Sequence, residues 1–141
     1  MAITPISTET GGDSSAIADL NQTYPLPLEP LPIVILGTGG IVNDAHLPAY
    51  AKAGFRVEGV FDLDESRSRA TAEKWSIAKV FGSIGEALAA EAVVFDVAVP
   101  PKNLLGILEQ MRPGSIVLMQ KPMGKDLNDA RAIRQVCREK S

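Results

Sequence analysis

Short apolar runs alternate with helical segments five times from residue 33 to the end of the chain, and this rhythm is the strongest constraint on the fold. The first run, Ile33 to Leu36, is continuous and ends at Gly37, which is typical of a strand buried on both faces of a parallel sheet. Further strands are expected at residues 55–61, 79–81, 93–99 and 115–119. Because the connections are short, the pattern predicts right-handed crossovers and helices on both faces of the sheet.

Helices are expected between these strands, and capping residues mark where they begin. Asn43 or Asp44 opens the first helix, which has Pro48 in its first turn or at a kink. The other helices begin at Asp64, Ser83, Asn103 and Asp126 or Asn128. The whole pattern predicts an α/β fold, a Rossmann-type doubly wound parallel sheet with the strand order 3-2-1-4-5.

Residues 1–30 differ from the rest, since they are rich in Ser, Thr, Gly and Pro and show no clean hydrophobic period. The length of 141 residues suits one ordinary domain. We therefore assign residues 31–141 to the sheet domain and residues 1–30 to a flexible tail. Pro25, Pro27 and Pro30 exclude a helix near the end of the tail and favour an extended strip. An alternative is that the leucines of this strip lie along the domain surface or bind a partner.

Composition excludes several classes of function. A single cysteine, Cys137, and a single histidine, His46, exclude a disulfide framework and a cysteine-built or multi-histidine metal site. The net charge is −3, so nothing indicates a nucleic-acid surface. No apolar run reaches the roughly 18 residues that a membrane helix needs. No Lys or Arg precedes Lys52, which argues against a basic targeting peptide, and a cytoplasmic location is expected.

A glycine-rich turn follows the first strand and opens the first helix. This glycine turn comprises Gly37, Thr38, Gly39, Gly40, Ile41 and Val42. Gly37 allows the tight turn, and Gly39 lets the backbone approach a pyrophosphate at the helix N-terminus. Dinucleotide-binding turns follow the pattern Gly-x-Gly-x-x-Gly or Ala, and here Val42 stands at the third glycine position. The helix is therefore expected slightly further from the strand. A purely structural turn is the alternative.

Asp62 stands at the end of the second expected strand, 25 residues after Gly37. A carboxylate at this place accepts hydrogen bonds from both hydroxyls of an adenosine ribose and repels a 2′-phosphate, which favours NAD over NADP. Two alternatives stay open. Asp62 could cap the next helix, although Asp64 could equally do so, and Arg67 or Arg69 could accept the 2′-phosphate of NADP.

The end of the fourth strand lies beside the first strand, where open α/β sheets bind their ligands. We expect Val99, Pro100, Pro101 and Asn103 to line this crevice. The prolines could instead serve only to end the strand.

The end of the fifth strand carries Gln120-Lys121-Pro122-Met123-Gly124. Together with the glycine turn, the stretch from His46 to Tyr50, Asp62 and Pro100, it resembles the N-terminal domain of the Gfo/Idh/MocA family, named after glucose–fructose oxidoreductase and inositol dehydrogenase. The resemblance covers about residues 31–141. It implies NAD or NADP as cofactor, and hydride transfer to or from a hydroxyl carbon of a sugar, cyclitol or similar small molecule. It also implies that Lys121 is catalytic, that Gln120 and Lys121 lie by the nicotinamide, and that the Lys121–Pro122 bond is cis.

The chain departs from the family pattern in three ways. Gln120 replaces the usual glutamate, which keeps the hydrogen-bonding shape and removes the charge. No histidine follows the proline after strand four, and His46 is expected to pack or to cap. The substrate domain of the family is absent from the 141 residues, so this is either a fragment of a longer protein or a short one. We expect weak nucleotide binding, little turnover by this chain alone, and self-association or a need for the missing C-terminal domain.

Three classes of function remain. The leading one is the NAD(P)-binding half of an oxidoreductase. The second is a non-catalytic nucleotide-binding or redox-sensing module that uses the same cleft. The third is a methyltransferase-like α/β domain, against which the Lys-Pro element after strand five argues.

Overall fold

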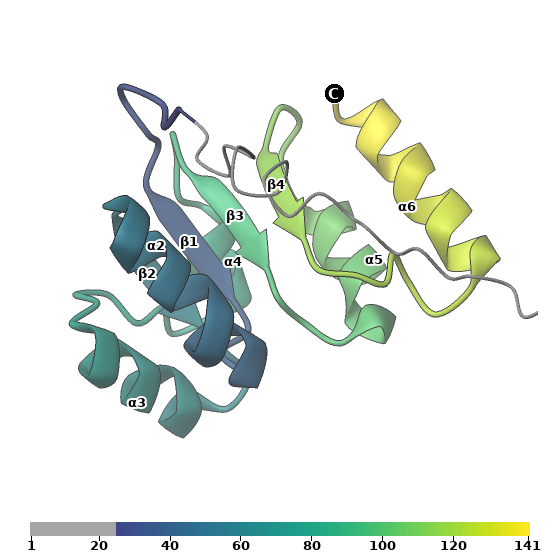
Figure 1. The fold of residues 1–141 in the computed structure, drawn as a ribbon. Coiled ribbons are helices and arrows are strands. Elements are labelled where there is room, and N and C mark those ends of the chain that lie inside the picture. Colours follow the sequence, from purple (N-terminus) through teal and green to yellow (C-terminus); the bar gives the residue numbers. More distant parts are fainter. Residues whose placement is uncertain (1–24) are drawn as a thin grey trace, which may run out of the picture.

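Four parallel strands form the central sheet of the computed structural model, which describes residues 25–141 (Figure 1). They are β1 (Ile33–Leu36), β2 (Val57–Phe61), β3 (Val94–Val97) and β4 (Ile116–Met119), in the order β2-β1-β3-β4. Leu36 at the end of β1 lies opposite Phe61 in β2 and Val97 in β3. The carboxyl ends of the central strands are therefore level, and they form one edge from which loops project. The predicted flexible tail at 1–30 falls mostly outside the described residues.

The predicted third strand is not a strand in the structure. Residues 79–81 make only an isolated parallel bridge between Val80 and Val60 of β2. The segment is too short to continue the ladder, because Ser83 already caps the next helix. With this bridge placed on the outer side of β2, the spatial order agrees with the predicted 3-2-1-4-5, although the number of strands was overestimated by one. The first strand keeps its predicted bounds, and the remaining strands lie where they were expected but are slightly shorter.

The first helical segment changes its winding at Pro48. A π-helical turn, η1 (Val42–His46), leads into α2 (Leu47–Ala53), which ends at Gly54 in the left-handed conformation. Proline has no N–H to donate and its ring crowds the preceding turn, so a wider turn just before Pro48 has a direct cause. Pro48 thus stands in the first turn of α2, which is one of the two placements predicted for it.

Side-chain caps begin three further helices at the predicted residues. Asp64 caps α3 (Glu65–Trp75), Ser83 caps α4 (Ile84–Leu88) and Asp126 caps α6 (Leu127–Glu139). In each case a side-chain oxygen accepts hydrogen bonds from backbone N–H groups of the first turn. Helix α5 (Pro101–Gln110) begins two residues before the predicted Asn103, because proline suits the first turn of a helix.

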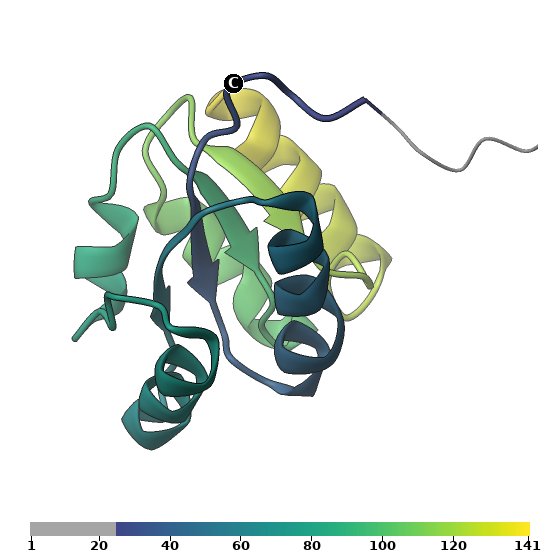
Figure 2. The same ribbon diagram turned by 60° about the vertical axis from the view of Figure 1, so that its left-hand side comes forward.

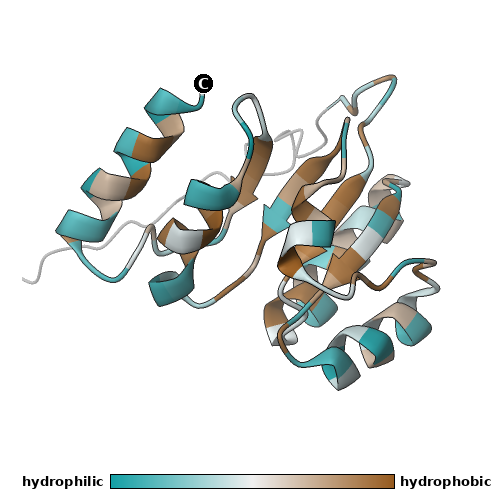
Figure 3. Ribbon diagram, turned by 180° about the vertical axis from the view of Figure 1, so that it is seen from behind, coloured by the Kyte–Doolittle hydropathy of each residue, from teal (hydrophilic) through white to brown (hydrophobic). Residues whose placement is uncertain are grey.

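Two hydrophobic layers enclose the sheet, with helices on both faces (Figure 2). Ile33 and Ile35 of β1 face the layer that α2 and α3 cover, whereas Val34 and Leu36 face the layer of α4, α5 and α6. All four residues are buried, which confirms the doubly wound prediction. Figure 3 shows hydrophobic residues gathered on the strands and hydrophilic residues on the outward sides of the helices.

Strand β4 lies at the edge of the sheet and exposes apolar side chains. Ile116 is 50% exposed and Leu118 is 51% exposed, although both stand in a four-residue apolar strand. This agrees with the prediction of an apolar edge, and self-association through it stays a prediction. Within residues 25–141 no helix has both the length and the apolar character that crossing a membrane requires.

Candidate functional site

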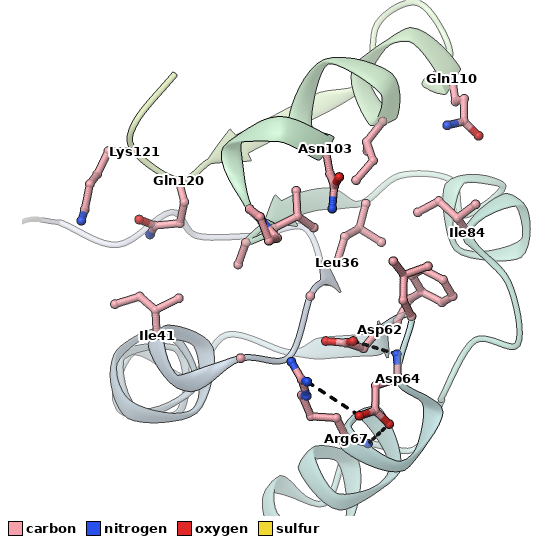
Figure 4. Close-up of a pocket in the computed structure, with 18 residues that line it drawn as sticks. Leu36, Ile41, Asp62, Asp64, Arg67, Ile84, Asn103, Gln110, Gln120 and Lys121 are labelled. Carbon is pink, nitrogen blue, oxygen red and sulfur yellow. Dashed lines mark hydrogen bonds and ion pairs between the residues drawn. The ribbon is translucent and has the colours of Figure 1, made fainter. Parts of the chain in front are cut away.

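A cavity of about 790 Å³ opens at the carboxyl ends of the strands (Figure 4). Its size is typical of a pocket for a small molecule or cofactor. Nine of the predicted site residues line it, namely Gly37, Gly39, Ile41, Asp62, Val99, Pro100, Asn103, Gln120 and Lys121. Asp64 and Arg67, which were considered as a helix cap and as a partner for a 2′-phosphate, also line it. No sequence signal indicated the other seven lining residues: Leu36, Phe61, Leu63, Ile84, Ala98, Ile107 and Gln110.

Four predicted site residues do not line the cavity. Thr38 and Val42 are the buried members of the glycine turn, and a Cβ built on Gly40 would face the Asp44 carboxylate. Pro101 belongs to the first turn of α5. These four residues lie next to lining residues in the sequence, and their contact with a cofactor stays a prediction.

The two glycines at the ends of the Gly-Thr-Gly stretch are needed for different reasons. Gly37 has φ +95°, and a Cβ there would lie 2.5 Å from the carbonyl oxygen of Ala98. Gly39 has no atom within 4 Å of the place of its missing Cβ, and it lines the cavity. Gly37 therefore serves the packing of the chain itself, whereas Gly39 leaves open space in which a ligand can approach the backbone.

Asn43 holds the glycine turn in shape. Its amide Nδ2 donates to the carbonyl oxygens of Thr38 at 3.1 Å and Gly39 at 3.3 Å, and to the hydroxyl of Thr71 at 3.1 Å. Its Oδ1 accepts a hydrogen bond from the indole of Trp75 at 3.1 Å. The sequence indicated Asn43 only as a helix start; its role in tying the turn to α3 depends on contacts with distant residues.

Asp62 faces the cavity and also fastens the glycine turn. Its Oδ2 accepts hydrogen bonds from the backbone N–H of Thr38 at 2.7 Å and from the Thr38 hydroxyl at 3.0 Å. Its Oδ1 accepts from the backbone N–H of Asp64 at 2.9 Å. Helix α3 is capped by Asp64, so that role is not filled by Asp62. A carboxylate has about four acceptor positions, and these three bonds leave capacity towards the cavity.

The two arginines on α3 are placed differently. Arg67 lines the cavity, with its Nη2 3.7 Å from Oδ2 of Asp64. Arg69 is paired with Glu65 and is not among the lining residues. A hydrogen bond from the Ser66 hydroxyl, joined by the backbone N–H of Arg67, lowers the pKa of Asp64 below its ordinary value. Of the two, only Arg67 could meet a group bound beside Asp62.

Gln120 and Lys121 lie across the cavity from Asp62 and Arg67 (Figure 4). They follow β4, and the Lys121–Pro122 peptide bond is cis, as the resemblance implied. The backbone N–H of Gln120 donates to the carbonyl of Val97 at 3.2 Å. One cavity thus has the glycine turn and Asp62 at one side and a lysine at the other.

A polar chain that the sequence analysis missed ends at Gln120. Nδ1 of His46 lies 2.7 Å from Oδ2 of Asp96, and Nε2 of His46 lies 2.6 Å from Nε2 of Gln120. The hydroxyl of Tyr50 donates to Asp96 at 2.9 Å. Burial, followed by the nearby charge of Asp96, raises the pKa of Tyr50. His46 makes no side-chain cap, but its ring packs edge-on against Tyr50, in agreement with the packing alternative. Its link between the core and the cavity was not predicted.

Known structures with the same fold include a dehydrogenase, an NAD-binding protein and a ketoreductase. UDP-N-acetylglucosamine 3-dehydrogenase from Acidithiobacillus ferrooxidans is 23% identical with a TM-score of 0.67 over 80% of this chain and 36% of its own. An NAD-binding protein from Listeria innocua is 27% identical with a TM-score of 0.68 over 79% and 33%. A 3-ketoreductase from Actinomadura kijaniata, solved with TDP-benzene and NADP, is 23% identical with a TM-score of 0.68 over 79% and 36%. The chain therefore spans about a third of the length of each.

Sequence comparison identifies the family. No curated protein sequence matches the chain. The model of the oxidoreductase family with an NAD-binding Rossmann fold matches residues 31–141, the same range that carries the sheet, the glycine turn and the Lys-Pro element. By this match, and in agreement with its fold, the chain belongs to the Gfo/Idh/MocA oxidoreductase family.

Proposed function

We propose that this domain binds NAD(H) in the cavity at the carboxyl ends of its strands and forms the cofactor-binding part of an oxidoreductase. The substrate would be a sugar, cyclitol or similar small molecule, at whose hydroxyl carbon a hydride is gained or lost. The observation that carries the proposal is the placement of the glycine turn, Asp62 and Lys121 around one cavity. Solved relatives of this fold include a sugar-nucleotide dehydrogenase and a ketoreductase, which agrees with this substrate class.

The residues at the glycine turn fit a dinucleotide. The open space at Gly39 lets a pyrophosphate come close to the backbone, and the first turn of the following helix presents N–H groups without partners inside the helix. Asp62 would accept hydrogen bonds from the hydroxyls of the adenosine ribose with its remaining acceptor capacity. Val99, Pro100 and Asn103 would line the space between the two ends of the cofactor.

We further propose that NAD(H) is preferred over NADP(H). The Asp62 carboxylate would repel a 2′-phosphate on the ribose that it holds. Arg67 lines the same part of the cavity and is the group that would favour NADP(H) if the preference were reversed. Arg69 carries less weight here, because Glu65 already pairs with it.

Lys121 would act on the substrate at the other end. The bound cofactor supplies the hydride chemistry, and the protein orients the substrate and moves its proton. The ammonium of Lys121 offers three hydrogen-bond donors with which to orient the substrate hydroxyl. As the hydroxyl carbon gives up a hydride, its oxygen gives up a proton, and a base from a substrate domain would take that proton while the Lys121 ammonium donates a hydrogen bond to the same oxygen; in its neutral amine form Lys121 would itself accept the proton.

Chemical-shift mapping by NMR tests the placement of the cofactor. We expect NAD⁺ to shift the backbone amide signals of Gly39, Ile41 and Asp62 and also those of Asn103 and Gln120. AMP, which has only the adenosine half, should shift the signal of Asp62 and leave Gln120 unchanged. Shifts confined to surfaces away from the cavity, or no shifts with either nucleotide, would overturn the proposed function.

A further inference from the structure

One buried charge stands in the middle of the apolar sheet. Asp96 is 2% exposed, and it is the only buried acidic or basic residue in the part of the chain that the structure describes. Its neighbours in β3 are Phe95 and Val97, both buried and apolar. Because an unpaired charge in such a place is very unfavourable, its partners are the reason that it can be accommodated.

The hydrogen-bond roles along the polar chain follow from Asp96. A carboxylate only accepts, so both the Tyr50 hydroxyl and Nδ1 of His46 donate to its Oδ2. In a neutral imidazole with the hydrogen on Nδ1, the other nitrogen, Nε2, is an acceptor. The atom of Gln120 facing that nitrogen at 2.6 Å is the amide Nε2, which is a donor. Every group in the chain from Asp96 to Gln120 therefore has a complementary role.

The polar chain ends at Gln120, directly before Lys121, the residue to which the proposed function assigns a catalytic role. Gln120 lines the cavity and is held twice, by its side chain through His46 and by its backbone N–H through Val97. Lys121 comes next in the chain, is exposed, and takes part in none of the ion pairs among the described residues. Within residues 25–141 no ion pair holds the Lys121 side chain, so the contacts of Gln120 are the nearest ones that fix the backbone on its N-terminal side.

We infer that His46 is a positioning residue for the reactive end of the cavity. Asp96 fixes the ring in one tautomer, the ring holds the amide of Gln120, and Gln120 places Lys121 beside the site of the nicotinamide. The inference rests on the proposed function. It assigns to His46, which lies far from Lys121 in the sequence, an effect on one half of the cofactor only.

The presence of glutamine at position 120 agrees with a neutral ring. A glutamate at this position would only accept a hydrogen bond, so Nε2 of His46 would need a hydrogen in addition to the one on Nδ1. The ring would then be an imidazolium between two carboxylates, that of the glutamate and that of Asp96. The groups that face His46 are the Asp96 carboxylate from β3, the Tyr50 hydroxyl from α2 and the uncharged Gln120. The uncharged side chain of Gln120 and the tautomer of His46 are thus two parts of one arrangement.

Nitrogen-15 NMR of the histidine ring tests the contact directly. His46 is the only histidine of the chain, so its two ring nitrogens give one unambiguous pair of signals. At neutral pH we expect Nδ1 to carry the hydrogen and Nε2 to show the shift of a hydrogen-bonded acceptor. Gln120→Met, which keeps the length of the side chain and removes the amide donor, should shift the Nε2 signal and leave Nδ1 almost unchanged. A hydrogen on Nε2 in the unsubstituted protein, or no response to Gln120→Met, would overturn the inference.

Nucleotide affinity tests the positioning role. His46→Asn keeps a donor that can turn towards Asp96 and removes the acceptor that reaches Gln120. We expect its affinity for NADH to fall about 3- to 10-fold while its affinity for AMP stays within twofold, because AMP occupies only the Asp62 side. Tyr50→Phe is the matched control, since it removes one bond to Asp96 and leaves the contact between His46 and Gln120, and both affinities should be nearly unchanged.

The outcomes separate the inference from the proposed function. Equal losses of NADH and AMP affinity in His46→Asn would show that His46 supports the domain as a whole, and unchanged NADH affinity would show that it positions nothing; either result overturns the inference. If His46→Asn fails to fold, the same comparison with Gln120→Met decides, because that side chain is partly exposed. Absence of NADH and AMP binding in the unsubstituted protein would overturn the proposed function, and the positioning role would fall with it.

Discussion

The side chain of Asp62 closes the glycine turn onto β2 by accepting both the backbone N–H and the hydroxyl of Thr38, at 2.7 Å and 3.0 Å. The residue proposed to select the cofactor therefore also shapes the loop that would hold the pyrophosphate. Any substitution of Asp62 therefore changes both the contact with the cofactor and the shape of the loop. Thr38→Val, which removes only the hydroxyl bond, separates the two effects and serves as a control for the experiments below.

Gly37 and Gly39 should respond in opposite ways to alanine. Gly37→Ala should lower the free energy of unfolding by about 2–4 kcal/mol, because the Cβ would meet the carbonyl of Ala98 and the residue has a positive φ. Gly39→Ala should change it by less than about 1 kcal/mol, since nothing lies near its Cβ, and should weaken NADH binding instead. Urea unfolding and NADH titration of both variants check this. Equal destabilisation by the two substitutions would contradict the division of roles.

Lys121 should matter for turnover far more than for cofactor affinity. In an enzyme form that carries a substrate domain, Lys121→Ala should reduce turnover by roughly 100-fold or more, the usual scale for a positioned proton-transfer group. Lys121→Arg should also be poor, because a guanidinium keeps its proton at neutral pH. The affinity for NADH should change little, since the glycine turn and Asp62 hold the other end. Near-normal turnover by Lys121→Ala would show that the lysine is structural and would favour a non-catalytic nucleotide-binding role.

The exposed edge strand β4 should drive association of the isolated chain. Ile116 and Leu118 expose about half of their surface, and an edge strand also has unpaired backbone donors and acceptors. Leu118→Lys should shift the chain towards monomer in sedimentation velocity at high concentration. Leu127→Lys on α6, where the leucine is also exposed, is the control and should leave the association unchanged. A protein that is already a monomer would contradict the prediction.

Two helix caps should make stability depend on acid pH. The hydrogen bond from the Ser66 hydroxyl lowers the pKa of Asp64, and the backbone N–H of Asp129 lowers the pKa of Asp126. Their contribution to stability is complete above the ordinary carboxyl pKa of about 4 and is lost as the pH falls through the lowered values. Asparagine caps a helix without titrating. Between neutral pH and about pH 2, the Tm of the double variant Asp64→Asn, Asp126→Asn should therefore decrease less than the Tm of the unsubstituted protein. Equal decreases in the two proteins would count against these caps.

Local chemistry made much of the fold predictable. A four-residue apolar strand, a glycine turn and caps at Asp64, Ser83 and Asp126 each depend on neighbours within a few residues, and the structure has them where they were expected. The segment 79–81 was mistaken for a strand although the cap at Ser83 was predicted, because the short stretch before that cap forms only a single bridge to β2.

The polar chain behind the cavity could not be predicted in the same way. His46 and Asp96 are 50 residues apart, and His46 and Gln120 are 74 residues apart. The one signal was Asp96 itself, an acid that interrupts an apolar strand and therefore needs a buried partner. The sequence does not say which partner that is, since the choice depends on how η1 packs across the sheet.

Calorimetric titration of NADH and NADPH into the unsubstituted protein and into Asp62→Ala tests whether the domain binds NAD(H) and whether Asp62 selects it over NADP(H). Glu73→Ala, which removes an exposed acid on α3 away from the cavity, is the matched control, and Thr38→Val accounts for the effect on the turn. We expect tighter binding of NADH than of NADPH and a loss of about 1–3 kcal/mol in NADH binding for Asp62→Ala, beyond any loss in Thr38→Val. Tighter binding of NADPH, or unchanged NADH affinity in Asp62→Ala, would contradict this expectation and direct attention to Arg67.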